Sequence, residues 1–316
     1  MEEEITHIVE TAKGIVFLSL TADDEDDAPV GGLFRITEKG KKDQANEILT
    51  TNETLSALWA SPKGHLWVGC ADGRVATTAP LGWAAPSDDA DYRAQNGGPA
   101  WTVATLPLDS VEQLPPNVTM MWGSADDDVH VGTHGGHLYH WNGKAWKQLR
   151  EGDGSADQTI VDIKGHGRDS VFAIGTRDLL LHFDGAQWRE LPTPGAPNES
   201  ESLGGIGLLP DGSVLICSAG DEGRLLHGGA AGFTEFGRYP LPLNDIAVIG
   251  DRVLFAIWDG VAELQGRKVK VVKSTFQTAG AFEGRDRVFF TEPDGEGLQF
   301  IVHDPSDDPP WQRRTY

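Results

Sequence analysis

A histidine followed six residues later by an aromatic residue recurs three times in the middle of the chain. The pairs are His140 with Trp146, His182 with Trp188, and His227 with Phe233. Such repetition is typical of a chain that stacks one supersecondary unit many times. The pattern therefore indicates that these histidines hold equivalent framework positions, and they are not interpreted as catalytic residues.

A short apolar run closed by glycine or another small residue marks one strand of every unit. Seven runs follow one another at residues 15–18, 66–69, 129–132, 171–175, 214–217, 253–256 and 288–291. Their spacing, on the order of 40 residues, is that of four-stranded propeller blades. Each run follows another apolar strand and precedes a turn, often Asp-Gly or Gly-Gly.

The chain lacks helical apolar periodicity over three turns, so the prediction is an all-β fold. We expect a single domain over residues 1–316, a seven-bladed β-propeller of four-stranded antiparallel blades. The expected blades are 5–50, 54–107, 117–150, 158–192, 203–239, 243–274 and 276–316. Each blade is contiguous in sequence, and segments 21–32 and 79–98 are expected to be loops.

The repeats resemble bacterial propeller repeats in which a Val-Trp-Val-Gly-like strand precedes a Gly-x-Leu-x-His-x-Asp/Asn-Gly-x-x-Trp stretch. Residues 66–69 carry the first element and residues 136–146 the second. The resemblance covers most of residues 55–274 and implies architecture alone. The chain has no regular Trp-Asp ending like that of WD40 repeats, and its Gly-Gly doublets are not placed as in kelch repeats. Function must therefore be argued from the sites.

The charge balance limits the classes of partner. The chain has 316 residues, with 26 Lys and Arg against 48 Asp and Glu, and a formal net charge of −22. Such a field repels nucleic acid and anionic membranes and attracts cationic partners. The acidic start and the lack of a long apolar run favour a cytoplasmic protein. Cys70 and Cys217 are interpreted as reduced, buried thiols.

Few residues suggest catalysis. No nucleophile elbow, zinc-protease helix motif, phosphate loop or dinucleotide fingerprint is present, so no catalytic residue, metal or cofactor is expected. The group from His130 to His140 is interpreted as structural, with the pair His134 and His137 left open as a metal site. Asp162 and Asp245, expected on inner strands near the channel, would be the first choices in an enzyme.

The strongest functional signal is an acidic loop face. In a propeller, the loops between second and third strands share a face with the connections between blades. The predicted partner-binding acids there are Asp23, Asp24, Glu25, Asp26, Asp27, Glu53, Asp153, Glu199, Glu201, Asp221, Glu222 and Asp259. Only Arg177 and Arg224 are expected to oppose them. Trp83 and Trp258 break the repeat pattern and are predicted to be exposed anchors for a partner.

These features predict a non-enzymatic propeller that captures a basic protein through its acidic face. An immunity or antitoxin protein that neutralises a bacterial toxin, as a monomer or in a 1:1 complex, fits the absence of catalytic motifs. One alternative is an enzyme, or a binder of a sugar or metal, centred on the channel. Another is a general assembly scaffold.

Overall fold

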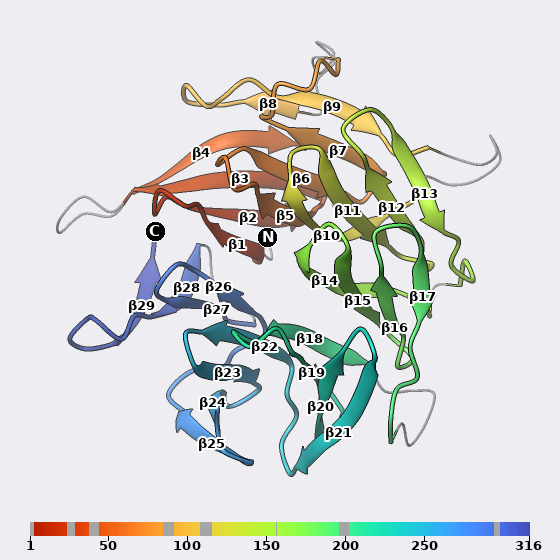
Figure 1. Ribbon diagram of the computed structural model, residues 1–316. Coiled ribbons are helices and arrows are strands. Elements are labelled where there is room, and N and C mark those ends of the chain that lie inside the picture. Colours follow the sequence, from red (N-terminus) through yellow and green to blue (C-terminus); the bar gives the residue numbers. More distant parts are fainter. Residues whose placement is uncertain are drawn as a thin grey trace.

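The computed structural model describes residues 3–23, 29–37, 44–84, 92–107, 116–155, 157–195, 202–220, 222–293 and 298–316. Within these residues the chain forms seven antiparallel sheets and no helix. Figure 1 shows the sheets arranged as a ring around a central axis. The predicted all-β class and the seven-bladed propeller are confirmed. Among the predicted partner-binding residues, Asp24 to Asp27, Glu199, Glu201 and Asp221 lie outside the described residues.

The strands of each blade run outward in sequence order. The inner strands are β1 (Glu3–Glu10), β5 (Leu55–Ala60), β10 (Val118–Ala125), β14 (Ile160–Gly167), β18 (Leu203–Leu208), β22 (Asp245–Ile249) and β26 (Ala281–Glu283). The second strands are β2 (Val16–Asp23), β6 (Leu66–Cys70), β11 (Asp128–Thr133), β15 (Ser170–Gly175), β19 (Val214–Ser218), β23 (Arg252–Ile257) and β27 (Val288–Thr291).

The third and outer strands complete the blades. The third strands are β3 (Pro29–Thr37), β7 (Arg74–Thr77), β12 (Leu138–Trp141), β16 (Leu180–Phe183), β20 (Gly223–Gly229), β24 (Gly260–Gln265) and β28 (Gln299–His303). The outer strands are β4 (Gln44–Thr51), β9 (Thr102–Thr105), β13 (Trp146–Arg150), β17 (Trp188–Glu190), β21 (Gly232–Tyr239), β25 (Lys268–Lys273) and β29 (Trp311–Thr315). A further strand, β8 (Tyr92–Ala94), pairs with β4.

The second strands are the most deeply buried part of each blade. Every residue of β6, β11 and β19 is buried. Both faces of these strands contact neighbouring blades, so most of their residues are apolar. Glycine ends three of the apolar runs, and at two of these glycines the next blade approaches closely. A Cβ on Gly69 would lie 2.4 Å from Val118 Cγ1, and one on Gly132 would lie 2.4 Å from Ile160 Cγ2.

Part of segment 79–98, expected to be a loop, forms strand β8 and extends the first blade. The backbone of β8 pairs with β4, so this insertion of the second blade reaches back to its neighbour (Figure 1). The Tyr92 hydroxyl donates to Cys70 Sγ at 2.9 Å, and both side chains are buried in one apolar cluster. Cys70 and Cys217 are buried free thiols.

The ring closes between the first and last blades without an exchanged strand. Strand β1 contacts β26, and a polar contact at Glu10 joins the first blade to the last. Its carboxylate accepts hydrogen bonds from Arg287 Nη2 at 2.9 Å and from the Arg285 backbone N–H at 3.0 Å. The described part of the chain contains no helix of the length and apolar character needed to span a membrane.

The close approach at Gly132 yields a stability prediction. Gly132→Ala adds a methyl group against Ile160 in a buried blade interface, so we expect it to lower the free energy of unfolding by about 1–3 kcal/mol. Gly167→Ala is the matched control, since its Cβ would meet only Asp169 Oδ1 at 3.9 Å. Chemical denaturation of both variants measures the difference. Equal stabilities would contradict the packing argument.

Candidate functional site

The loop face predicted to bind a partner carries acids that arginines partly compensate. Glu53 lies 3.8 Å from Arg74, and Asp153 lies 3.7 Å from Arg177. Buried Arg224 forms an ion pair with Asp178. The sequence predicted Arg177 and Arg224 as the opposing cations and missed Arg74, which also pairs with Asp72. The net negative charge of this face is therefore smaller than a count of its acids suggests.

The sixth blade presents an exposed tryptophan on this same face. Trp258 is 53% exposed and lies in the turn between β23 and β24, next to exposed Asp259. Glu222, in the corresponding turn of the fifth blade, is also exposed. The predicted exposure of Trp258 therefore agrees with the structure.

Trp83 is packed, so its predicted exposure is wrong. Its indole meets Trp67 edge-on at a centroid distance of 5.5 Å and Trp141 at 4.9 Å. It also lies against Trp146 at 6.2 Å. The insertion that carries Trp83 folds back onto the boundary between the second and third blades, where aromatic packing partly buries the ring.

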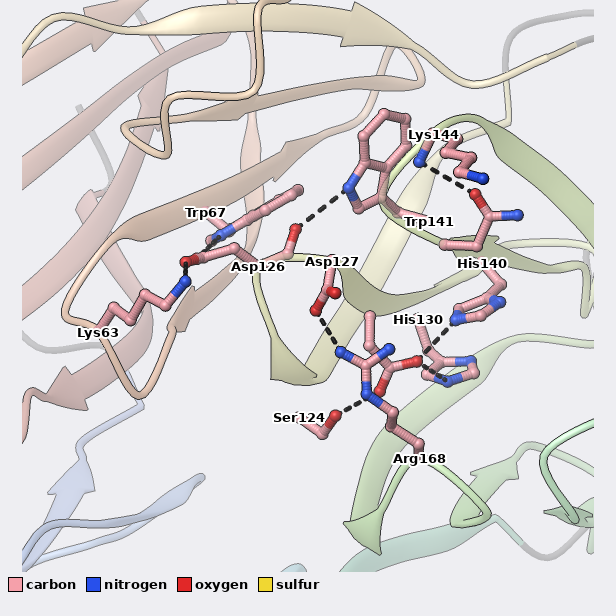
Figure 2. Close-up of polar contacts among 12 residues, drawn as sticks. Lys63, Trp67, Ser124, Asp126, Asp127, His130, His140, Trp141, Lys144 and Arg168 are labelled. Carbon is pink, nitrogen blue, oxygen red and sulfur yellow. Dashed lines mark hydrogen bonds and ion pairs between the residues drawn. The ribbon is translucent and has the colours of Figure 1, made fainter.

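On the opposite face, the first two of three consecutive aspartates tie the third blade to its two neighbours (Figure 2). Asp126 accepts hydrogen bonds from His65 Nδ1 at 2.9 Å and Trp67 Nε1 at 3.3 Å, both in the second blade. Burial alone would raise the pKa of Asp126, but the hydrogen bonds from His65, Ser61 and Trp67 hold it below its usual value. Asp127 forms an ion pair with Arg168 of the fourth blade.

The third aspartate, Asp128, belongs to a buried cluster with two histidines. Its carboxylate is paired with His140 Nε2 at 2.8 Å and lies 3.9 Å from His130 Nε2. The His130 ring has no exposed surface and is surrounded by aromatic rings, including His140 at 4.4 Å and Phe183 at 4.9 Å. Burial lowers the pKa of His130 to about 3, so this ring is neutral.

The composition of this cluster suits a transition metal, but its ring geometry does not. Three ligand atoms of Asp128, His130 and His140 lie within 4.8 Å of one another. However, the two imidazoles are stacked with planes only 14° apart. A histidine nitrogen binds a metal at about 2.0–2.1 Å, along a lone pair in the ring plane. Two nearly parallel, stacked rings cannot direct those lone pairs at one ion.

The other histidines of this region contact separate partners. His134 Nδ1 lies 2.8 Å from Thr159 Oγ1, whereas His137 Nδ1 accepts from Gln148 Nε2 and the Gly152 N–H. His182, one of the repeat histidines, packs against Phe172. His227 Nε2 lies 2.9 Å from Ser213 Oγ. His137, His182 and His227 thus contribute packing or hydrogen bonds within their own blades, and His134 links the third blade to the fourth.

The central channel holds a second group of functional candidates. A cavity of about 320 Å³ is lined by residues of all seven inner strands. Among its lining residues are Asp162 and Asp245, the two carboxylates expected there from the sequence. A bulge at the start of each of strands β5, β10, β14 and β18 sets which residues line the channel.

The two channel aspartates bind backbone groups of the following blade. Asp162 Oδ2 accepts from the Ile206 N–H at 2.8 Å, and Asp245 Oδ2 accepts from the Ala281 N–H at 2.8 Å. Burial is the main cause that raises the pKa of both carboxyl groups, to about 7 for Asp245, while nearby Lys164 acts in the opposite direction. Both groups therefore hold a proton more readily than an exposed aspartate.

Sequence reasoning missed the lysine and glutamate that complete this group. Lys164 Nζ, in the fourth blade, lies 3.4 Å from Glu283 Oε1 in the seventh. The sequence contains one signal for Lys164. It lies two positions after Asp162, and residues i and i+2 of a strand share a face. The pairing with Glu283 depends on ring closure, since the two residues are 119 positions apart.

No family model and no curated protein matches the sequence. Several solved propellers match the fold. YCF48 from Cyanidioschyzon merolae superposes with a TM-score of 0.63 at 15% identity, over 95% of each chain. The WD40 propeller domain of Doa1 gives 0.61 at 11% identity, over 93% of this chain and 90% of that one. YCF48 bound to D1 peptide gives 0.57 at 14% identity, over 84% and 82%. Similarity at these identities shows the shared fold alone.

The raised pKa of Asp245 predicts a pH dependence of stability. The pKa of Asp245 is about 7 in the folded protein, above the ordinary 3.8, so the folded state binds this proton more tightly than the unfolded state. The stabilisation of the folded state by this proton is complete below pH 3.8 and is lost as the pH rises toward 7. We therefore expect the free energy of unfolding of the wild type, relative to Asp245→Asn, to fall between pH 4 and 7. Denaturation at several pH values measures this difference. A pH-independent difference would contradict the prediction, and exposed Asp259→Asn controls for the loss of one carboxylate.

Proposed function

We propose that this propeller is a non-enzymatic, cytoplasmic protein that binds a basic protein partner through its acidic loop face. The seven-bladed fold is compatible with protein binding, and YCF48, which has the same architecture, has been solved bound to a peptide. The proposal extends this general role to a particular face and to a partner of particular charge.

The observation that carries the proposal is exposed Trp258 beside exposed Asp259. A tryptophan left in solvent loses the favourable burial of a large apolar ring, and such residues are enriched where partners anchor. Its position in a tight turn fixes the ring on the loop face. An adjacent carboxylate suits a partner surface that presents Lys or Arg next to an apolar recess.

Long-range charge supports a basic partner. The net charge of −22 attracts a cationic protein from a distance, even though Arg74, Arg177 and Arg224 compensate part of the face locally. Glu222 and Asp259 remain exposed in neighbouring blades and provide the local contacts. In this proposal, the net charge of the whole chain attracts the partner from a distance, and residues of the fifth and sixth blades hold it in place.

The partner that best fits this charge is a basic toxin, such as a nuclease, with this protein as its immunity partner. An acidic surface competes with an anionic substrate for the cationic active site of such a toxin. Affinity capture from the native host, followed by mass spectrometry, tests this step. One stoichiometric basic partner that salt releases supports it, whereas many weak partners would instead indicate an assembly scaffold.

Charge reversal tests the assigned face. Glu222→Lys combined with Asp259→Lys should weaken binding of the captured partner roughly tenfold or more, mainly through slower association at low salt. The control reverses two exposed acids on the opposite face, Asp251→Lys with Asp286→Lys, and changes the net charge equally. Surface plasmon resonance at two salt concentrations measures both rates. Equal loss in the two variants would leave only non-specific charge attraction and refute the assigned face.

Removal of the exposed indole tests the anchor. Trp258→Ala should accelerate dissociation and weaken binding by about 2 kcal/mol or more if the ring inserts into the partner. The matched control is Val271→Ala, which truncates an equally exposed apolar side chain (53%) on outer strand β25. Titration calorimetry with the captured partner compares the two. An unchanged dissociation constant for Trp258→Ala would remove this residue from the interface.

A further inference from the structure

An ion pair crosses the central channel. Lys164 extends from β14 of the fourth blade and meets Glu283 of β26 in the seventh, with two blades between them on one side and three on the other. Both side chains line the cavity and remain partly accessible, Lys164 at 20% and Glu283 at 31%. A strong donor and a strong acceptor therefore stand together within a solvent-accessible cavity.

Surrounding groups hold this ion pair in place. Glu283 Oε1 also accepts from the Val248 N–H at 2.9 Å, which fixes the carboxylate against the sixth blade. Asp162 and Asp245 add negative charge near Lys164, and together with Glu283 they raise the pKa of its ammonium group despite burial. Glycine at position 205 leaves room for Asp245, since a Cβ there would lie 2.2 Å from Asp245 Oδ1.

The second and third blades line the channel with apolar and aromatic side chains. Trp59, Met120 and Trp122 line the cavity there, and both tryptophans are only half-buried. Each indole lies over a glycine of the next blade. A Cβ on Gly123 would be 2.8 Å from Trp59 Cη2, and one on Gly165 would be 2.9 Å from Trp122 Cη2.

The geometry points to a small neutral saccharide as the ligand of this channel, stacked on Trp59 or Trp122 and hydrogen-bonded to Lys164 and Glu283. Each sugar hydroxyl both accepts and donates, so adjacent hydroxyls can accept from the Lys164 ammonium and donate to the Glu283 carboxylate. The apolar C–H face of a pyranose ring matches a flat indole. A cavity of about 320 Å³ admits one or two such rings.

Charge disfavours the other small ligands. An anion would enter a cavity whose carboxylates outnumber its one lysine, in a protein of net charge −22. A cation would have to approach the Lys164 ammonium, which already pairs with Glu283 and interacts electrostatically with Asp162 and Asp245. A neutral polyol meets neither barrier and can use both members of the ion pair. This site does not depend on the proposed partner face, which lies on the loops.

Calorimetry and saturation-transfer NMR on the full chain test the site. The probes are glucose, galactose, mannose, maltose and cellobiose, with glucuronate and glucosamine as charged counterparts, at concentrations up to about 10 mM. The expected result is saturable binding of at least one neutral sugar, with strongest saturation on its ring C–H protons. No saturable binding of any neutral probe, or stronger binding of a charged counterpart, would overturn the proposal.

Substitution of Lys164 then locates the binding. Lys164→Met keeps the aliphatic stem and should weaken sugar binding roughly tenfold or more by removing a charged donor. Lys270→Met, on outer strand β25, is the control and should bind like the wild type. If Lys164→Met fails to fold, Glu283→Gln replaces it, and a loss of roughly tenfold is again expected. Unchanged affinity in the folded variant would place the sugar elsewhere and overturn the proposal.

The sugar proposal and the partner proposal can be refuted independently of each other. Trp258→Ala lies outside the lining of the channel and should leave sugar affinity unchanged. Conversely, Lys164→Met leaves the exposed Trp258 and Asp259 turn intact. Loss of sugar binding in Trp258→Ala would contradict the channel site, whereas a failed partner capture would leave it standing.

Discussion

The ring is held together by close packing at the boundaries between blades, where the second strand of one blade meets the inner strand of the next. Val118 and Ile160 occupy the space beside Gly69 and Gly132, where a side chain on either glycine would overlap them. A single twisted sheet cannot bury both of its faces, so each blade needs two neighbours. The apolar second strands and their terminal glycines both follow from this requirement.

Hydrogen bonds between the inner strands of neighbouring blades also hold the ring together. The side-chain group that forms them differs between the early and the later blades. In the first blades a hydroxyl donates to the next blade, as Thr6 Oγ1 does to the Leu55 carbonyl at 2.8 Å and Thr119 Oγ1 does to the Ile160 carbonyl at 2.7 Å. In the later blades a carboxylate accepts instead, at Asp162 and Asp245. The charged residues Asp162, Lys164, Asp245 and Glu283 thus line the channel from the fourth, sixth and seventh blades, whereas Trp59 and Trp122 line it from the second and third.

The sequence predicted the architecture because local signals repeat in every blade. Apolar runs, terminal glycines and turn residues all lie within one unit, and they were sufficient to indicate seven four-stranded sheets. Contacts between units were harder to predict. The pairing of Lys164 with Glu283, the return of β8 to the first blade and the packing of Trp83 all depend on how distant segments meet in space. The arginine at position 74 was missed because its pairing depends on side-chain direction, which a loop count does not capture.

The lysine in the channel follows from the carboxylates around it. Asp162 and Asp245 fasten two blade boundaries, and both lie where burial raises their pKa. Two ionised carboxylates in one narrow channel would repel each other, and the neutral acid accepts weaker hydrogen bonds from the backbone than the carboxylate does. Lys164 offsets that repulsion, and Glu283 in turn balances Lys164. A requirement of the fold thus leaves a donor and an acceptor side by side at the surface of a cavity. The same residues that stabilise the ring supply the groups that a polar ligand needs.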